Sequence, residues 1–167
     1  IHHWTANGLP TLLISEEMSE LALGKRTLQF VSDVPQEHWR TSMTSVEKAL
    51  ATYSGERAKC YVAEACRTAE VAAEQIEKAV KDYGVRCVVV DYAGLLQSPG
   101  KSRYEQMTNT SVAMRQAASS NKVVLVLQCQ LSREIEKRPK FMPVSSDLRD
   151  TGQLEQDADV IIFCCWP

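Results

Sequence analysis

The stretch Cys87-Val88-Val89-Val90-Asp91 decides the fold that this sequence predicts. A continuous apolar run of this length is typical of a strand buried on both faces of a parallel sheet, because a strand with one wet face alternates apolar and polar residues. The run ends in an acid. Ligands bind beyond the carboxyl ends of the strands in an open parallel sheet, so Asp91 is a candidate binding residue.

Other short apolar runs lie on both sides of this strand. They predict strands over residues 11–15, 59–63, 123–127 and 160–164, the last two as fully buried as residues 86–91. Helical periodicity and capping residues predict helices over residues 1–6, about 16–30, about 35–53, 68–83 and about 102–119. This alternation implies right-handed crossovers and a mostly parallel sheet with helices on both faces. The expected fold class is therefore α/β, in a single domain over residues 1–167.

The composition is that of a globular protein with one core, since 44% of the 167 residues are hydrophobic and 24% are charged. A formal charge of −2 argues against a protein that coats nucleic acid through a broad basic face, although a few loops could still bind DNA. The sequence contains no apolar run of membrane-spanning length and no secretory pattern. We therefore expect no membrane partner and a cytoplasmic location.

The cysteines and histidines do not have the spacing of a metal site. None of the six cysteines forms a C-x2-C pair, and most lie in apolar strand-like runs, so we expect reduced core thiols. They are Cys60, Cys66, Cys87, Cys129, Cys164 and Cys165. His2, His3 and His38 are not spaced to complete a zinc site.

Two carboxylates follow predicted strands. Asp91 at the tip of its strand has the form of a Walker B acid, which holds magnesium, often through water, beside nucleotide phosphates. Glu17 follows the strand 11–15 and could orient or deprotonate an attacking water in the same crevice. The alternative for Glu16 and Glu17 is a place in a first helical turn, where the macrodipole favours acids.

Gln130 follows the predicted strand 123–127, where its amide could hydrogen-bond a γ-phosphate. A purely structural glutamine is the alternative. By themselves Arg133, Arg138 and Lys140 indicate a solvated, mildly basic loop.

A longer pattern begins at Ser146 and reads Ser-Asp-Leu-Arg-Asp-Thr-Gly-Gln-Leu-Glu-Gln-Asp-Ala-Asp, ending at Asp159. It is very similar to the pattern S-D-L-R-[ED]-S-G-x-I-E-Q-D-A-D of the DnaB family of replicative helicases, whose motor is a RecA-like P-loop NTPase core. The resemblance covers residues 12–163 in order. Fourteen residues in one block are far more specific than a single strand-end acid, and they strengthen the other assignments.

The resemblance implies a role for each candidate. Ser15-Glu16-Glu17-Met18 matches the family's S-L-E-M and implies that Glu17 is the catalytic glutamate. Asp91-Tyr92 resembles D-Y-[LI]-Q-L and implies a magnesium-associated aspartate, and Cys129-Gln130-Leu131 resembles S-Q-L and implies that Gln130 senses phosphate. In the family the single-strand backbone contacts a loop onto which three residues of this chain fall: Arg149, Asp150 and Gly152.

The chain also departs from the family pattern. Glu16 stands where leucine is usual, Cys129 replaces serine, and Gln106 and Val112 replace a glutamate and an arginine of the S-R-x-x-E…I-S-R pattern. No G-x-x-x-x-G-K-[ST] phosphate loop occurs, and the downstream basic residues that act across the subunit interface are absent. We expect that the chain opens in mid-helix just after such a loop, as a partial RecA-like domain that binds ATP poorly and does not hydrolyse it alone.

In its full protein, the resemblance implies an ATP- and magnesium-dependent DNA helicase motor that forms a homohexamer and moves along single-stranded DNA. Primase and a helicase loader are the further partners that it implies. Two alternatives keep the fold: another RecA-like ATPase serving as a recombination or clock-type regulator, and a RecA-like scaffold that does not hydrolyse ATP.

Overall fold

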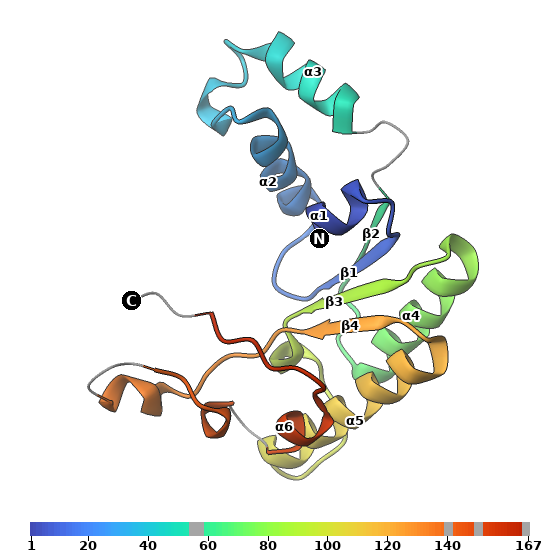
Figure 1. Cartoon of the computed structure of the whole chain (residues 1–167), viewed down its shortest axis with the longest axis vertical. Helices are drawn as coiled ribbons and strands as arrows, with labels where there is room; N and C mark the ends of the chain where they lie inside the picture. The colour runs from blue at the N-terminus through green and yellow to red at the C-terminus, as the bar shows by residue number, and fades with distance from the viewer. Residues whose placement is uncertain (54–58, 139–141, 149–151, 165–167) are drawn as a thin grey trace.

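The computed structural model describes residues 1–53, 59–138, 142–148 and 152–164 (Figure 1). At its centre is a four-stranded sheet in the order β2-β1-β3-β4, with every neighbouring pair parallel. The strands are β1 (Thr11–Ser15), β2 (Cys60–Glu64), β3 (Cys87–Asp91) and β4 (Val124–Leu127). The predicted α/β class and parallel sheet are confirmed.

The helices lie on both sides of this sheet. They are α1 (His2–Ala6), α2 (Glu20–Ser32), α3 (Met43–Tyr53), α4 (Ala69–Tyr83), α5 (Arg103–Asn121) and α6 (Gln153–Asp157). Figure 1 shows α4 and α5 together on one side and α1 on the other, while α2 and α3 extend away from the sheet. Among the described residues, no helix has both the length and the apolar character needed to cross a membrane.

The core explains why β3 is apolar throughout. Val88 and Val90 are fully buried in a cluster with Ile76 of α4 and Met114 of α5. Val89 points to the opposite face, as alternation along a strand requires, and is also buried at 4% exposure. Both faces of β3 therefore exclude water, which the continuous apolar run indicated.

Side-chain caps fix the starts of the long helices. The hydroxyls of Ser19, Thr68 and Ser102 accept hydrogen bonds from backbone N–H groups three residues later, at 3.2–3.3 Å. At the start of α5, Ser102 and Glu105 do not form a complete capping box, because Glu105 accepts from the Lys101 N–H at 2.6 Å rather than from that of Ser102.

The helix predicted from residue 35 to 53 is interrupted. A 3-10 turn, η1 (Gln36–His38), is followed by turns, and α3 begins only at Met43. The Thr41 hydroxyl donates to the His38 carbonyl at 2.9 Å, a local bond that competes with helix continuation.

The strand predicted at residues 160–164 is wrong, and the burial predicted for 123–127 is incomplete. Residues 160–164 have no strand assignment, and Val160 and Ile162 are 75% and 82% exposed. Val124 is 60% exposed because β4 is the last strand on its side of the described sheet. Apolar residues form a strand only when a neighbouring strand pairs with their backbone, and residues 160–164 have no such neighbour in the described chain.

The cysteines are free thiols, as predicted, wherever the structure describes them. Cys66 and Cys87 are buried, but Cys164 is exposed, so the expectation of a core position is wrong there. Burial, with the neighbouring Glu16 carboxylate, raises the pKa of Cys66 to about 11. Burial alone raises the pKa of Cys129 to about 11.

We predict that Ile76→Ala lowers the free energy of unfolding by about 2–5 kcal/mol, because it leaves a cavity between α4 and the sheet. Ile76 is fully buried. Urea denaturation followed by circular dichroism measures the change. The control is Leu21→Ala, whose side chain is 70% exposed and should change stability by no more than about 0.5 kcal/mol. Equal effects of the two substitutions would contradict this description of the core.

We also predict that iodoacetamide at pH 8 modifies Cys164 well before Cys66 or Cys129. A thiol whose pKa is about 11 has roughly one thiolate in a thousand at that pH, and the thiolate is the reactive form. Peptide mass spectrometry of a Cys165→Ser variant assigns the label uniquely. Early modification of Cys66 would contradict the buried position and the raised pKa described for this thiol.

Candidate functional site

The carboxyl ends of β1, β3 and β4 meet at one edge of the sheet. Ser15 lies opposite Asp91 in the β1–β3 register, and the Glu16 N–H donates to the Asp91 carbonyl at 2.9 Å. On the other side of β3, the Gln128 N–H donates to the Val90 carbonyl at 3.1 Å. The segments that carry Glu17, Asp91 and Gln130 therefore lie side by side, as the sequence predicted.

Ser15 shapes the segment that carries Glu17. Its buried hydroxyl donates to the Met18 carbonyl at 2.7 Å and accepts from the Met18 N–H at 3.2 Å. These two hydrogen bonds stabilise a bend over residues 16–18, and α2 begins only at Glu20. The alternative placing of Glu16 and Glu17 in a first helical turn is wrong, and Glu17 is exposed in the bend.

Glu16 has a structural role that the sequence did not reveal. One carboxylate oxygen accepts from the Cys66 N–H at 2.8 Å and the other from the Arg67 N–H at 3.0 Å. Ala65 and Arg67 have left-handed φ values of 57° and 59°, which non-glycine residues adopt rarely. Glu16 thus ties the end of β1 to a strained turn after β2. The only sequence signal was an acid where the family has leucine.

Asp91 is half-buried at the tip of β3. The described residues contain no group of three or more His, Cys, Asp or Glu side chains that could hold a metal ion. The described residues therefore do not form a metal site in which side chains of this kind supply three or more ligands. A single carboxylate fits a magnesium ion that keeps several waters and arrives with nucleotide phosphates.

The loop after β3 is held against α5. The Gln106 side chain donates to the Gly100 carbonyl at 3.3 Å, and Asn109 donates to the Pro99 carbonyl at 2.7 Å. Gly100 has φ 153°, and a Cβ there would lie 2.8 Å from the Gln106 backbone nitrogen. Gln106, a departure from the family pattern, is therefore used to fix this loop.

Gln130 is exposed, and the chain beyond it returns to pair with the block at residues 146–159. Leu131 and Leu148 form an antiparallel bridge, and the Ser132 N–H donates to the Asp147 carbonyl at 2.7 Å. The residues directly after Gln130 therefore contact the residues directly before Arg149.

Asp147 is buried at 2% exposure and is ion-paired with Arg138. The Arg138 guanidinium donates to both carboxylate oxygens, and the Val144 N–H donates to one of them at 2.8 Å. Hydrogen bonds from Arg138 and the backbone lower the pKa of Asp147. Arg138 is only partly solvated, since its side chain is 36% exposed and ion-paired with a buried acid that the sequence did not reveal. Arg133 is exposed, and Lys140 lies outside the described residues.

Asp157 anchors α6 to α5. It accepts from the Ser111 hydroxyl at 2.7 Å, from Gln153 at 2.9 Å and from Arg115 at 3.2 Å. Burial raises its pKa, but the hydrogen bonds from Ser111 and Gln153 and the charge of Arg115 outweigh burial, so the pKa lies below its ordinary value.

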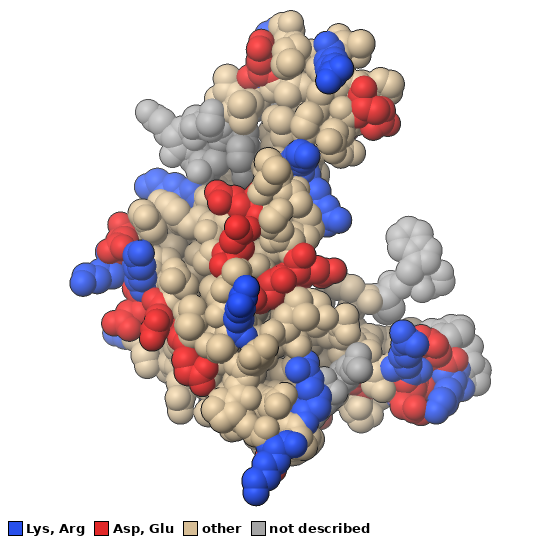
Figure 2. Space-filling model, turned by 180° about the vertical axis from the view of Figure 1, so that it is seen from behind, with Lys and Arg blue, Asp and Glu red and all other residues tan. Residues whose placement is uncertain are grey.

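Of the three predicted DNA-contacting residues, Arg149 and Asp150 lie outside the described residues. Gly152 is described, and it is exposed at the start of α6. Figure 2 shows basic and acidic side chains interspersed on the face that it presents, which agrees with the expectation of no broad basic surface there.

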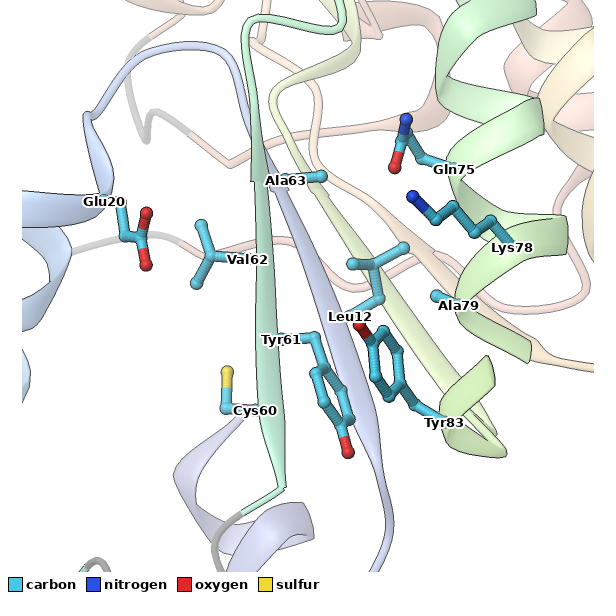
Figure 3. Close-up of a pocket in the computed structure, with 10 residues that line it drawn as sticks. All are labelled: Leu12, Glu20, Cys60, Tyr61, Val62, Ala63, Gln75, Lys78, Ala79 and Tyr83. Atoms are coloured by element: carbon cyan, nitrogen blue, oxygen red, sulfur yellow. The ribbon is translucent and has the colours of Figure 1, made fainter. Parts of the chain in front are cut away.

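A hollow of about 340 Å³ lies along the edge strand β2 (Figure 3). Tyr61 and Tyr83 stack there with ring centroids 4.2 Å apart. Its lining does not include Glu17, Asp91 or Gln130, so we assign it no part in the site.

The order of the strands, the strand-end residues and the block at residues 146–159 together point to one family. The family model of the DnaB-like helicase C-terminal domain matches residues 2–166. The chain belongs to this family.

Curated relatives of this DnaB-like domain are replicative helicases. The probable plasmid replicative DNA helicase of Chlamydia trachomatis is 41% identical over 92 residues, which are 54% of this chain and 20% of that protein. The replicative DNA helicase DnaB of Leifsonia xyli is 30% identical over 163 residues, 93% of this chain and 35% of that protein. The chain thus spans 20–35% of the length of these relatives.

Solved structures have the same fold as this DnaB-like domain. One of them, described as an ATPase domain, has a TM-score of 0.84 at 25% identity, over 95% of this chain and 60% of that one. A DnaB-like replicative helicase, solved in a study of its interactions with primase, has a TM-score of 0.82 at 26% identity, over 93% and 40%. These likenesses confirm the predicted RecA-like fold.

We predict that Ser111→Ala lowers the free energy of unfolding by about 1.5–3 kcal/mol at pH 7, since it removes a hydrogen bond to a charged group. The depressed pKa of Asp157 contributes stability above its ordinary value of 3.8, and this is lost as pH falls through the folded-state pKa. The difference between wild type and variant should therefore shrink below about pH 4. Urea titrations at pH 7 and pH 3 measure it, with the exposed Ser120→Ala as control. A difference independent of pH would contradict this assignment.

Proposed function

We propose that this domain is the motor of a replicative DNA helicase, which hydrolyses ATP and uses the energy to move along single-stranded DNA. The observation that carries the proposal is the β1–β3 register, which sets Ser15 opposite Asp91 and brings the Glu17 and Asp91 segments to one edge. The family supports the choice of activity, since the relatives above are replicative helicases.

Glu17 is proposed as the catalytic residue that activates water. The bend over residues 16–18 leaves its carboxylate exposed at the edge where a nucleotide would sit. A carboxylate there can accept a proton from a water molecule as that water attacks the terminal phosphorus of ATP. Glu16, held by two backbone N–H groups, limits movement of the backbone that carries Glu17.

Asp91 is proposed to hold magnesium through water, together with the phosphates of ATP. Magnesium supplies charge neutralisation at those phosphates when it is bound. The tip of β3 suits this task because its backbone is fixed by hydrogen bonds to neighbours on both sides, through Glu16 and Gln128.

Gln130 is proposed to sense the γ-phosphate through its side-chain amide. Arg149, Asp150 and Gly152 are proposed to contact the backbone of single-stranded DNA, where an arginine and backbone amides grip phosphates without reading bases. The contacts of Leu131 and Ser132 with Leu148 and Asp147 support a short path between the two sites.

The assembly and the partners are also proposals. We propose a homohexamer in the cytoplasm that binds primase and a helicase loader. A solved DnaB-like replicative helicase was described with its interactions with primase, which supports the first of these partners. The 167 residues contain no G-x-x-x-x-G-K-[ST] pattern, so ATP turnover is expected of the full protein that its gene encodes rather than of this chain alone.

We predict that Glu17→Gln lowers DNA-stimulated ATP turnover by the full protein at least about 100-fold, since general-base catalysis contributes about 10²–10⁴-fold. ATP turnover is measured with and without single-stranded DNA. The matched control is Glu20→Gln, an exposed acid three residues later, which should retain turnover. Turnover indifferent to DNA and to Glu17→Gln would refute the helicase proposal, leaving the fold and the family.

A further inference from the structure

We propose that Asp147 and Arg138 form a positioning pair that joins the segment after β4 to the start of the block at residues 146–159. The pair holds Leu131 and Ser132 against Leu148, so that a displacement at Gln130 is passed to the residues that follow Leu148. This inference rests on the proposed function, and it adds two positioning residues that touch neither nucleotide nor DNA.

Asp147 has the contacts expected of such an anchor. Its side chain is 2% exposed and accepts hydrogen bonds from Arg138 and from the Val144 N–H at 2.8 Å. Its own carbonyl accepts from the Ser132 N–H at 2.7 Å. One residue therefore contacts Arg138, the chain entering the block and the chain leaving β4.

Arg138 extends this anchor across the intervening segment. Besides the two bonds to Asp147, its guanidinium donates to the Met142 carbonyl at 3.1 Å. Two contacts therefore join the segment after β4 to the start of the block. They are the ion pair between Arg138 and Asp147 and the bridge between Leu131 and Leu148.

A small apolar cluster gives independent support. Leu154 of α6, Ala93 after β3 and Met107 of α5 form a buried group, against which Leu148 and Cys129 pack. Cys129 directly precedes Gln130, and Leu148 and Leu154 lie on either side of residues 149–152. Both flanks of these residues therefore pack on the cluster that the end of β4 contacts.

The ion pair is what makes these contacts sensitive to single substitutions. A buried carboxylate is tolerated only when its charge is compensated, so removing Arg138 leaves the Asp147 carboxylate, 2% exposed, without its charged partner. Removing the charge of Asp147 frees an Arg138 side chain that is 36% exposed. The Lys137–Glu134 pair beside it is exposed on both side chains, at 73% and 65%, and should contribute little to the same segment.

The first experiment uses the 167-residue chain and needs no activity. Amide hydrogen exchange is compared by NMR in wild type, Asp147→Asn and Arg138→Met, with Asp159→Asn and Lys137→Met as exposed controls. The amides of Ser132 and Leu148 should exchange roughly ten- to hundred-fold faster in the first two variants and not in the controls. The Gln128 amide, which bonds to β3, should be unchanged in all of them.

The second experiment uses the full protein and separates positioning from general stability. The readout is the ratio of ATP turnover with single-stranded DNA to turnover without it. Asp147→Asn should lower this ratio about ten-fold while turnover without DNA changes less than about two-fold, because only the coupling is lost. Arg138→Lys keeps the charge but loses the bidentate fork, and it should give an intermediate ratio. This milder variant carries the test if Asp147→Asn does not fold.

Unchanged exchange at Ser132 and Leu148 would overturn the inference whatever the activity of the protein. Faster exchange with an unchanged turnover ratio would also overturn it, because the pair would then be structural only. A wild-type protein that DNA does not stimulate would refute the proposed function itself, which is a different result from a stimulated wild type whose variants are stimulated equally.

Discussion

The parallel register of β1 on β3 is the constraint on which the rest of this structure depends. β3 is buried on both faces and bonded on both edges, so its tip is a fixed point. Asp91 is placed by that strand, and the Glu16 and Gln128 backbones are placed by bonds to it. The chemistry we propose needs a few polar groups at one edge, and this register supplies them before any side-chain contact is considered.

Three acidic residues stabilise the structure through hydrogen bonds or an ion pair. Glu16 fixes a left-handed turn after β2, Asp147 closes the segment after β4, and Asp157 joins α6 to α5. Glu17 differs from them because it is exposed in the bend after β1, whereas Asp91 is half-buried at the tip of β3. Asp147 and Asp157, in the block at residues 146–159, therefore have structural roles, and the contact of this block with DNA is a proposal.

The sequence predicted the features that depend on local patterns. The apolar run before Asp91 and the caps at Thr68 and Ser102 indicated β3, α4 and α5 correctly. The prediction was wrong where the structure of a segment depends on a partner that is distant in the sequence. Residues 160–164 are apolar enough for a strand, but no strand in the described chain pairs with them. Arg138 looked solvated for the same reason, since its partner Asp147 lies nine residues away across a loop. The roles of Glu17, Asp91 and Gln130 were hypotheses from their positions after predicted strands, which the family resemblance strengthened, and they remain proposals.

The measurement that tests the proposed site most directly is an experimental structure of the full protein with magnesium, a non-hydrolysable ATP analogue and single-stranded DNA. We predict that the terminal phosphate lies beyond the tips of β1, β3 and β4. Glu17 should face it, Asp91 should face the metal and the Gln130 amide should be within hydrogen-bond distance of it. A nucleotide bound elsewhere, with these three side chains turned to solvent, would contradict the proposed site.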